Sequence, residues 1–144
     1  MGFSHVEATQ LFCEGGAAGR EHQSLLFTTF PVVTQVSTQS ASHLITCSSA
    51  AATALSCGEK TTNYVMGMDK DKKRKLNSIT HQLKEKGYKI GIITSAPIDH
   101  ATPGGFYASQ PSRKMYYEIG QDAANSNFDF FAGAGLAETR SRTN

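Results

Sequence analysis

Two short segments carry side chains that could bind a phosphate and react with it. In residues 46–50, Ser48 stands where an alanine-rich helix is expected to begin. The free N–H groups and the positive dipole end of a helix favour an anion, so a phosphate bound there would lie against the hydroxyl of Ser48. The loop 94–103 follows an apolar strand and contains His100 and Thr102. Ligands of open parallel sheets collect beyond the carboxyl ends of the strands, which makes this loop the second candidate.

Both candidates have a structural alternative. Serine is a common N-cap, so Ser48 on local sequence is equally well an ordinary helix cap. In the same way, Asp99 and His100 are equally well solvated turn residues. The local sequence leaves both alternatives open.

Helices and strands must alternate to position these segments. The run 50–55, with Ser48 or Ser49 as N-cap and Gly58 beyond its end, predicts a short helix. The spacing of Leu76, Ile79 and Leu83 predicts an amphipathic helix over 69–87.

That helix leads into an apolar strand at 90–93, and residues 64–66 can supply a partner strand. Together they predict a right-handed βαβ crossover with strands buried on both faces. A further helix over 113–124 leads into a strand at 128–131 and a glycine turn. The predicted fold class is therefore α/β, with a mostly parallel sheet and helices on both faces, as a single domain over residues 1–144.

The N-terminal part has weaker signals. The S-x-x-E spacing of residues 4–7 predicts a short helix that ends at Gly15 and Gly16. Residues 31–36 are rich in β-branched side chains and predict an extended segment.

The bulk composition restricts the function classes. The formal net charge of +2 indicates neither a nucleic-acid partner nor a membrane-surface role. No apolar stretch is long enough to span a bilayer, and no signal peptide is expected at the N-terminus. The three cysteines (Cys13, Cys47 and Cys57) show neither zinc-site spacing nor a disulfide framework, which predicts buried or idle thiols. The basic residues of segment 69–75 could contact nucleic acid, but interleaved aspartates favour a solvated helix face.

The motifs resemble those of one family. Residues 45–63 resemble the active-site signature of the alkaline phosphatases, in which a serine opens an alanine-rich helix before G-x-K-T-x-N. Residues 100–103 (H-A-T-P) and 112–114 (S-R-K) resemble two further segments of that family, in the same order and spacing. Residues 1–4 resemble the end of its G-D-G-M-G turn, and 128–135 its next strand and glycine turn. The resemblance covers nearly the whole chain.

The resemblance implies a phosphomonoester hydrolase. Ser48 would attack phosphorus and become a phosphoserine, and Arg113 would hold two phosphate oxygens through its planar fork. The full-length enzyme would need zinc and magnesium. The Oγ atom of Ser48 would lie on a zinc ion that lowers its pKa, and Thr102 would bind magnesium. His100 stands where the family has Asp or His, and would join the magnesium site directly or through water.

The resemblance also implies partners and a location. Phosphate monoesters would be the substrates, the full-length enzyme would form a homodimer, and the family's location is periplasmic or extracellular.

Two departures from the family pattern bear on activity. Cys47 replaces the aspartate that in most members orients the arginine. A cysteine here also raises a sulfatase interpretation, but the C-x-P-S-R pattern of sulfatases is absent. The family's other metal ligands lie before Met1 and beyond Asn144, so Ser48, Thr102 and His100 are expected to form an incomplete metal site. The alternative function is therefore a truncated, catalytically inactive α/β module that at most binds phosphate weakly where the Ser48 helix begins.

Overall fold

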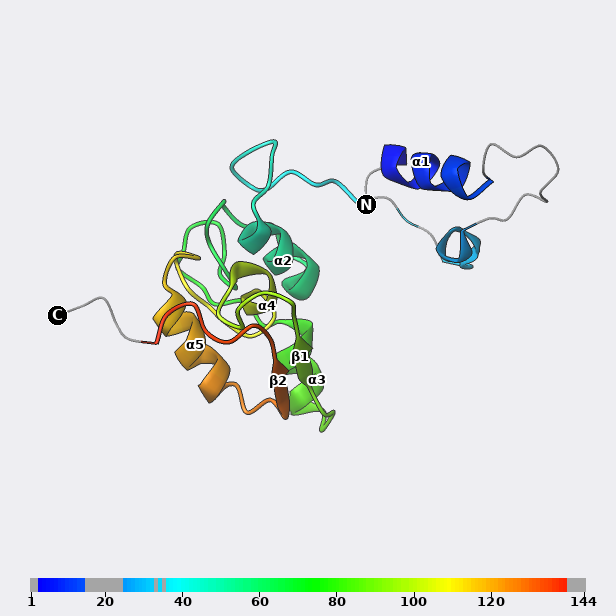
Figure 1. Cartoon of the computed structure of the whole chain (residues 1–144). Helices are drawn as coiled ribbons and strands as arrows, with labels where there is room; N and C mark the ends of the chain where they lie inside the picture. The colour runs from blue at the N-terminus through cyan, green and yellow to red at the C-terminus, as the bar shows by residue number, and fades with distance from the viewer. Residues whose placement is uncertain (1–2, 15–24, 33, 35, 140–144) are drawn as a thin grey trace. The chain divides into compact units, whose positions relative to one another are not determined.

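The computed structural model describes residues 3–14, 25–32, 34 and 36–139. It divides into two compact units, Met1–Ser37 and Thr38–Asn144, and each unit is described by itself (Figure 1). The single domain expected over residues 1–144 stays a prediction.

The described part of the first unit contains two short helices. They are α1 (Phe3–Glu14) and the 3-10 helix η1 (Leu26–Thr29). The predicted N-terminal helix is present, but Ser4 lies inside α1 and is not its cap. The predicted end at Gly15 and Gly16 lies outside the described residues. Of the segment 31–36, the described residues belong to no strand, and positions 33 and 35 are not described.

The second unit combines helices with a parallel pair of strands. Its elements in chain order are α2 (Ser48–Cys57), α3 (Ile79–Glu85), β1 (Gly91–Ile93), α4 (Ala101–Gly104), α5 (Tyr116–Asn125) and β2 (Phe130–Ala132). Strands β1 and β2 pair in parallel, with Gly91 opposite Phe130 and Ile93 opposite Ala132. This arrangement confirms the predicted α/β class with a parallel sheet and helices.

The predicted βαβ crossover is wrong in its first strand. Residues 64–66 do not pair with β1. Instead, Met66 forms an isolated antiparallel bridge with Gln110. Tyr64 and Gly67 have φ angles of 71° and 57°, and these left-handed conformations interrupt any regular strand between them. The strands are also not buried on both faces, because Ile93 is 76% exposed.

Helix α3 is much shorter than the predicted helix over 69–87. Ser78 is its N-cap, and its side chain accepts a hydrogen bond from the N–H of His81. Before it, the N–H of Lys72 donates to the carbonyl of Asp69 at 3.1 Å, and Lys72 has a φ of 59°. This turn stops a helix from starting at Asp69, so the basic segment lies in a loop and not on a helix face.

The later elements are close to their predicted places. Helix α5 begins at Tyr116, so Arg113 precedes the helix and does not start it. Strand β2 begins at Phe130, two positions after the predicted start. None of the described helices is long and apolar enough to cross a membrane. All three cysteines are free thiols.

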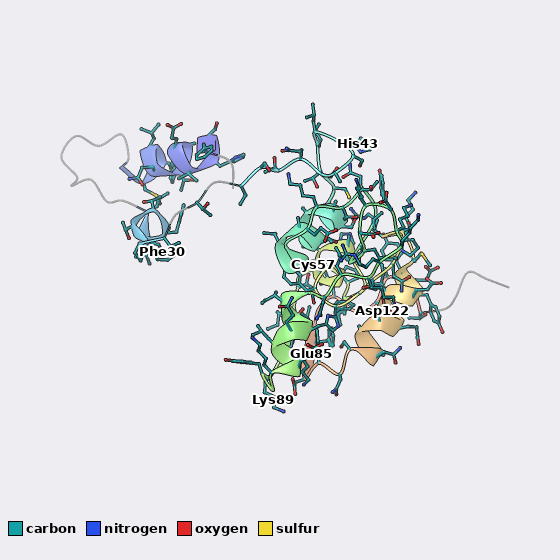
Figure 2. The ribbon with its side chains drawn as sticks, turned by 180° about the vertical axis from the view of Figure 1, so that it is seen from behind. Phe30, His43, Cys57, Glu85, Lys89 and Asp122 are labelled. Carbon is teal, nitrogen blue, oxygen red and sulfur yellow. The ribbon has the colours of Figure 1, made fainter. Side chains whose placement is uncertain are left out.

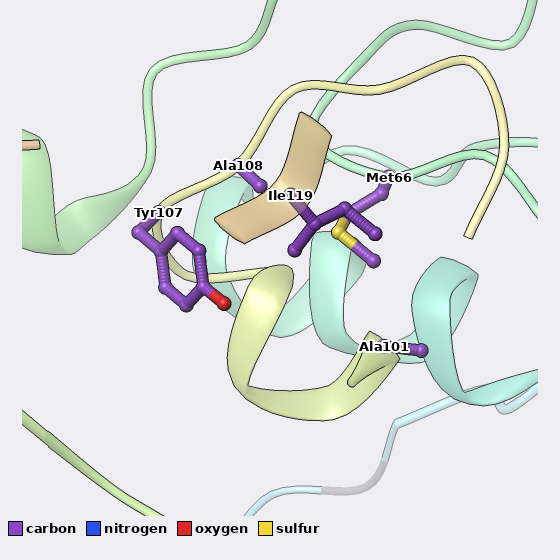
Figure 3. Packing of buried hydrophobic residues seen from close by; sticks show 5 residues of the cluster. All are labelled: Met66, Ala101, Tyr107, Ala108 and Ile119. Carbon is purple, nitrogen blue, oxygen red and sulfur yellow. The ribbon is translucent and has the colours of Figure 1, made fainter. Parts of the chain in front are cut away.

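The core of the second unit includes residues of α4 and α5, and partly buried side chains of β1 and β2 pack against it. Figure 3 shows its five buried residues. Its buried cluster consists of Met66, Ala101, Tyr107, Ala108 and Ile119. The ring of Tyr107 meets Phe131 of β2 edge to face, with ring centroids 5.4 Å apart. This packing fixes α4, and with it the loop that carries His100, against the sheet.

Candidate phosphate-binding site

The N-terminus of α2 presents Ser48. Cys47, and not Ser48 or Ser49, is the N-cap of this helix, so that prediction is wrong. The first intrahelical hydrogen bond runs from the N–H of Ala51 to the carbonyl of Cys47 at 3.0 Å, which leaves the preceding N–H groups outside the helical ladder. Ser48 is exposed, and its hydroxyl has no hydrogen-bond partner among the described residues. A free hydroxyl therefore lies at the positive end of a ten-residue helix.

The thiol of Cys47 is held beside that helix start. Its Sγ lies 3.1 Å from the Oγ of Ser49 and accepts a hydrogen bond of 3.1 Å from the N–H of Tyr64. Burial raises the pKa of the Cys47 thiol, but hydrogen bonds from the Ser49 side chain and the Tyr64 backbone outweigh it and lower the pKa to about 7. These hydrogen bonds therefore favour the thiolate form of Cys47.

Asn63 fixes the backbone just before Ser48. Its Oδ1 accepts from the N–H of Cys47 at 3.1 Å, and its Nδ2 donates to the carbonyl of Ile45 at 3.0 Å. Sequence reasoning did not name Asn63 as a site residue. The signal was present, because Asn63 is the last residue of the G-x-K-T-x-N pattern.

Arg113 and His100 meet on the other side of Tyr64. The backbone N–H of Arg113 donates to the carbonyl of Tyr64 at 2.7 Å. The Nη2 of Arg113 lies 3.5 Å from the Nε2 of His100. Because a guanidinium only donates, the Nε2 of His100 must be the acceptor in this contact. Tyr64 thus bonds to Cys47 through its N–H and to Arg113 through its carbonyl, which brings the predicted Ser48 and Arg113 segments together.

His100 is also the N-cap of α4, and Thr102 lies in this helix. Thr102 is exposed and lines a cleft of about 380 Å³ together with Pro103, Phe106 and residues of β1. No hydrogen bond joins Thr102 to Ser48 or Arg113 in the described part of the chain. The structure therefore places Thr102 near His100 in sequence, but does not link its hydroxyl to the other predicted site residues.

Asp99 is not a solvated turn residue. It is fully buried, and its carboxylate accepts hydrogen bonds from the N–H groups of Ala137 and Glu138 at 2.8 to 3.1 Å. These bonds tie the loop before α4 to the segment after β2. Asp99 is a structural residue that holds the His100 loop in place.

The described residues do not form a metal site by themselves. Over residues 3–14, 25–32, 34 and 36–139, no group of three or more His, Cys, Asp or Glu side chains is placed to hold a metal ion. Zinc sites use three or four such ligands, and magnesium favours carboxylate oxygens. The hydroxyls of Ser48 and Thr102 and the imidazole of His100 are at most part of such a site.

The exposed hydroxyl of Ser48 lies at a helix start, and its neighbour Cys47 is connected through Tyr64 to Arg113, an arrangement that could bind a phosphate. Comparison with known proteins identifies the family. The family model for alkaline phosphatase matches residues 1–132. The chain belongs to the alkaline phosphatase family.

Individual relatives agree with this assignment. Over 104 residues, the chain is 36% identical to an alkaline phosphatase of Schizosaccharomyces pombe. This match covers 69% of this chain and 19% of the relative. It is 41% identical over 85 residues to alkaline phosphatase 4 of Bacillus subtilis, covering 59% of this chain and 17% of the relative. The chain thus spans about a fifth of the length of these curated relatives.

Solved structures give the same result. A cold-active alkaline phosphatase from Shewanella sp. is 32% identical with a TM-score of 0.79, and the match covers 90% of this chain and 32% of that one. The enzyme from the Antarctic bacterium TAB5 is 31% identical with a TM-score of 0.74, covering 91% of this chain and 36% of that one. A mutant of the TAB5 enzyme is described with Mg bound in its M3 site.

Proposed function

We propose that this chain supplies the nucleophile and the phosphate-binding arginine of a phosphomonoester hydrolase. Membership of the alkaline phosphatase family supports the reaction class. The observation that carries the residue roles is the pair of hydrogen bonds made by Tyr64, which connects the start of the Ser48 helix to Arg113.

In the proposed reaction, the Oγ of Ser48 forms a bond to phosphorus while the ester P–O bond breaks. The alcohol leaves with the proton that Ser48 loses, and a phosphoserine remains. Water then hydrolyses this phosphoserine, which restores Ser48 and releases inorganic phosphate. Arg113 binds two phosphate oxygens with parallel N–H donors, and the positive dipole end of α2 favours the same anion.

Zinc and magnesium are part of the proposal for the full-length enzyme. The Oγ of Ser48 would contact zinc, and Thr102 and His100 would lie toward magnesium. Such ions supply a lowered pKa for the serine hydroxyl and stabilise the leaving oxygen. Since the described residues do not complete either site, the remaining ligands would come from outside them.

Family membership also supports the proposed context. Phosphate monoesters are the proposed substrates, the full-length enzyme is proposed to be a homodimer, and a periplasmic or extracellular location is proposed for it.

A second candidate function follows from the incomplete metal site. On this alternative the chain is a catalytically inactive α/β module that binds phosphate weakly at the N-terminus of α2. The lack of a three-ligand metal group among the described residues favours it.

Turnover of p-nitrophenyl phosphate with added zinc and magnesium tests both candidates, alongside binding of orthophosphate. If the chain is the hydrolase, Ser48→Ala abolishes turnover, and Arg113→Lys lowers kcat/KM by more than about tenfold because lysine lacks the planar fork. Lys86→Ala is a control at an exposed position outside both candidate segments and should keep the wild-type rate. A folded chain without turnover whose orthophosphate binding is lost in Arg113→Ala supports the inactive module. A folded chain with neither turnover nor phosphate binding refutes both.

A further inference from the structure

The loop 69–75 concentrates positive charge that the proposed reaction does not use. It contains five basic and two acidic residues. Arg74 is paired with Glu59 at 2.9 Å. The four lysines are all exposed, and none forms an ion pair with any other described residue (Lys70, Lys72, Lys73 and Lys75). The free charge of this loop is available to a ligand.

Hydrogen bonds give the loop a defined shape. Met68 and Lys75 form an antiparallel bridge, and the N–H of Asp69 donates to the carbonyl of Arg74 at 2.9 Å. The Oδ1 of Asp69 accepts from the backbone N–H of Lys73 at 2.8 Å, so this carboxylate is engaged inside the turn. The lysines therefore extend from a closed turn and not from a disordered tail.

The loop is anchored next to the candidate phosphate site. The Oγ1 of Thr62 donates to the carbonyl of Lys70 at 3.0 Å. The carbonyl of Thr62 also accepts from the N–H of Val65 at 3.1 Å, which closes the turn that contains Tyr64. Tyr64 in turn accepts the backbone hydrogen bond of Arg113. Thr62, which anchors Lys70, and Tyr64, which anchors Arg113, are separated by one residue, so their Cα atoms are at most roughly 7 Å apart.

We propose that the loop 69–75 binds the additional phosphates of an oligophosphate substrate while Arg113 holds the terminal phosphate that is transferred. This inference rests on the proposed function, because it needs a phosphate at Arg113. Lysine is a compact charge on a flexible stem and attracts a phosphate chain without a fixed geometry. Arginine holds one phosphate in one orientation. The two residue types thus suit the two parts of such a substrate.

An oligophosphate fits the loop better than a nucleic acid does. The free lysines lie within six residues, and this loop has no aromatic side chain on which a base could stack. The formal net charge of the whole chain is only +2, which gives no further indication of a nucleic-acid partner. A nucleic acid is therefore an outcome of the test and not the proposal.

The test measures binding of inorganic tripolyphosphate and of orthophosphate to the whole chain by titration calorimetry at low salt. Lys70→Gln/Lys72→Gln removes two charges from the loop. Lys86→Gln/Lys89→Gln removes the same charge at the end of the second unit where Lys89 lies, away from His43 (Figure 2). Because Lys89 also pairs with Asp129 at 3.1 Å, urea unfolding is used to check that this variant is folded. We expect the wild-type chain to bind tripolyphosphate about tenfold more tightly than orthophosphate. In the loop variant, the affinity for tripolyphosphate should fall about three- to tenfold, while the affinity for orthophosphate stays unchanged. The control variant should behave as wild type.

Several results would overturn the proposal. One is a wild-type chain that binds tripolyphosphate no more tightly than orthophosphate, and another is an equal loss in the control variant. If a 5′-phosphorylated oligonucleotide loses affinity in the loop variant and tripolyphosphate does not, the loop is a nucleic-acid contact instead. Arg113→Ala tests the proposed function separately. If Arg113 does not bind phosphate, this variant binds orthophosphate as tightly as wild type does.

Discussion

Gly105→Ala is predicted to destabilise the chain because α2 and α4 pack without room for one methyl group. A Cβ atom at Gly105 would lie 2.4 Å from the Cβ of Ala52 on α2. The φ of Gly105 is −60°, an ordinary helical value, so the backbone itself accepts any residue. The steric contact with Ala52 is therefore the reason that this position needs glycine.

The size of the effect follows from that contact. Overpacking a core by a methyl group costs about 1–3 kcal/mol. Ala52→Gly removes the Cβ that Gly105→Ala would strike, and by itself costs about 1 kcal/mol through helix propensity. In the double variant the clash is absent, because the next atoms of Ala52 lie at 3.1 and 3.3 Å, within reach of a small shift. The double variant should then be about as stable as Ala52→Gly alone.

Urea unfolding followed by circular dichroism measures the four free energies of this cycle. We expect a coupling energy of about 1–3 kcal/mol between the two substitutions. Purely additive effects, or a Gly105→Ala variant as stable as wild type, would refute the packing argument. Because α2 begins at Ser48 and α4 is capped by His100, Gly105→Ala should also weaken orthophosphate binding, and the double variant should restore it.

Two further predictions concern titratable groups. The side chain of Lys84, the N–H of Ile90 and the side chain of Lys89 hold the pKa of Asp129 well below its usual range. The stability that Asp129 contributes is therefore present above about pH 4 and is lost as the pH falls toward the pKa of the folded state. The urea midpoint of Asp129→Asn should accordingly drop less between pH 7 and pH 3 than the urea midpoint of wild type does. Asp71→Asn is the charge-matched control, and an equal drop in all three proteins would contradict the role of these contacts. Iodoacetamide at pH 7.5 should alkylate Cys47 faster than Cys57, because hydrogen bonds lower the pKa of Cys47 to about 7 whereas burial raises that of Cys57. Equal rates for the two thiols, read by mass spectrometry, would count against this.

Local sequence was sufficient for some elements and not for others. Helix α2 was predicted because its alanine run and Gly58, which adopts a φ of 71° at the C-cap, both act within the helix. The predicted helix over 69–87 failed because apolar spacing does not reveal the turn that Asp69 closes or the left-handed φ of Lys72. The predicted pairing of residues 64–66 with β1 was also wrong, since Met66 instead pairs with Gln110, and local sequence does not reveal a pairing between residues so far apart in the chain.

In the candidate site, too, some residues could be predicted from the sequence and others could not. Ser48, Arg113 and His100 were named because side-chain chemistry and motif spacing mark them. Tyr64 was not named, because it acts through its backbone N–H and carbonyl, which every residue except proline possesses. No residue type can signal such a role.

The segment after Tyr64 depends on close backbone contacts in the same way, at residues that carry no candidate role of their own. Gly67 donates its N–H to the Oγ1 of Thr53 in α2 at 2.9 Å, and a Cβ at Gly67 would lie 2.0 Å from the carbonyl oxygen of Ala108. The same short segment therefore contacts α2 on one side and the segment 108–113 on the other. The relative position of Ser48 and Arg113 is set by how closely this segment fits between them, so a change at Gly67 would alter the site without touching a phosphate.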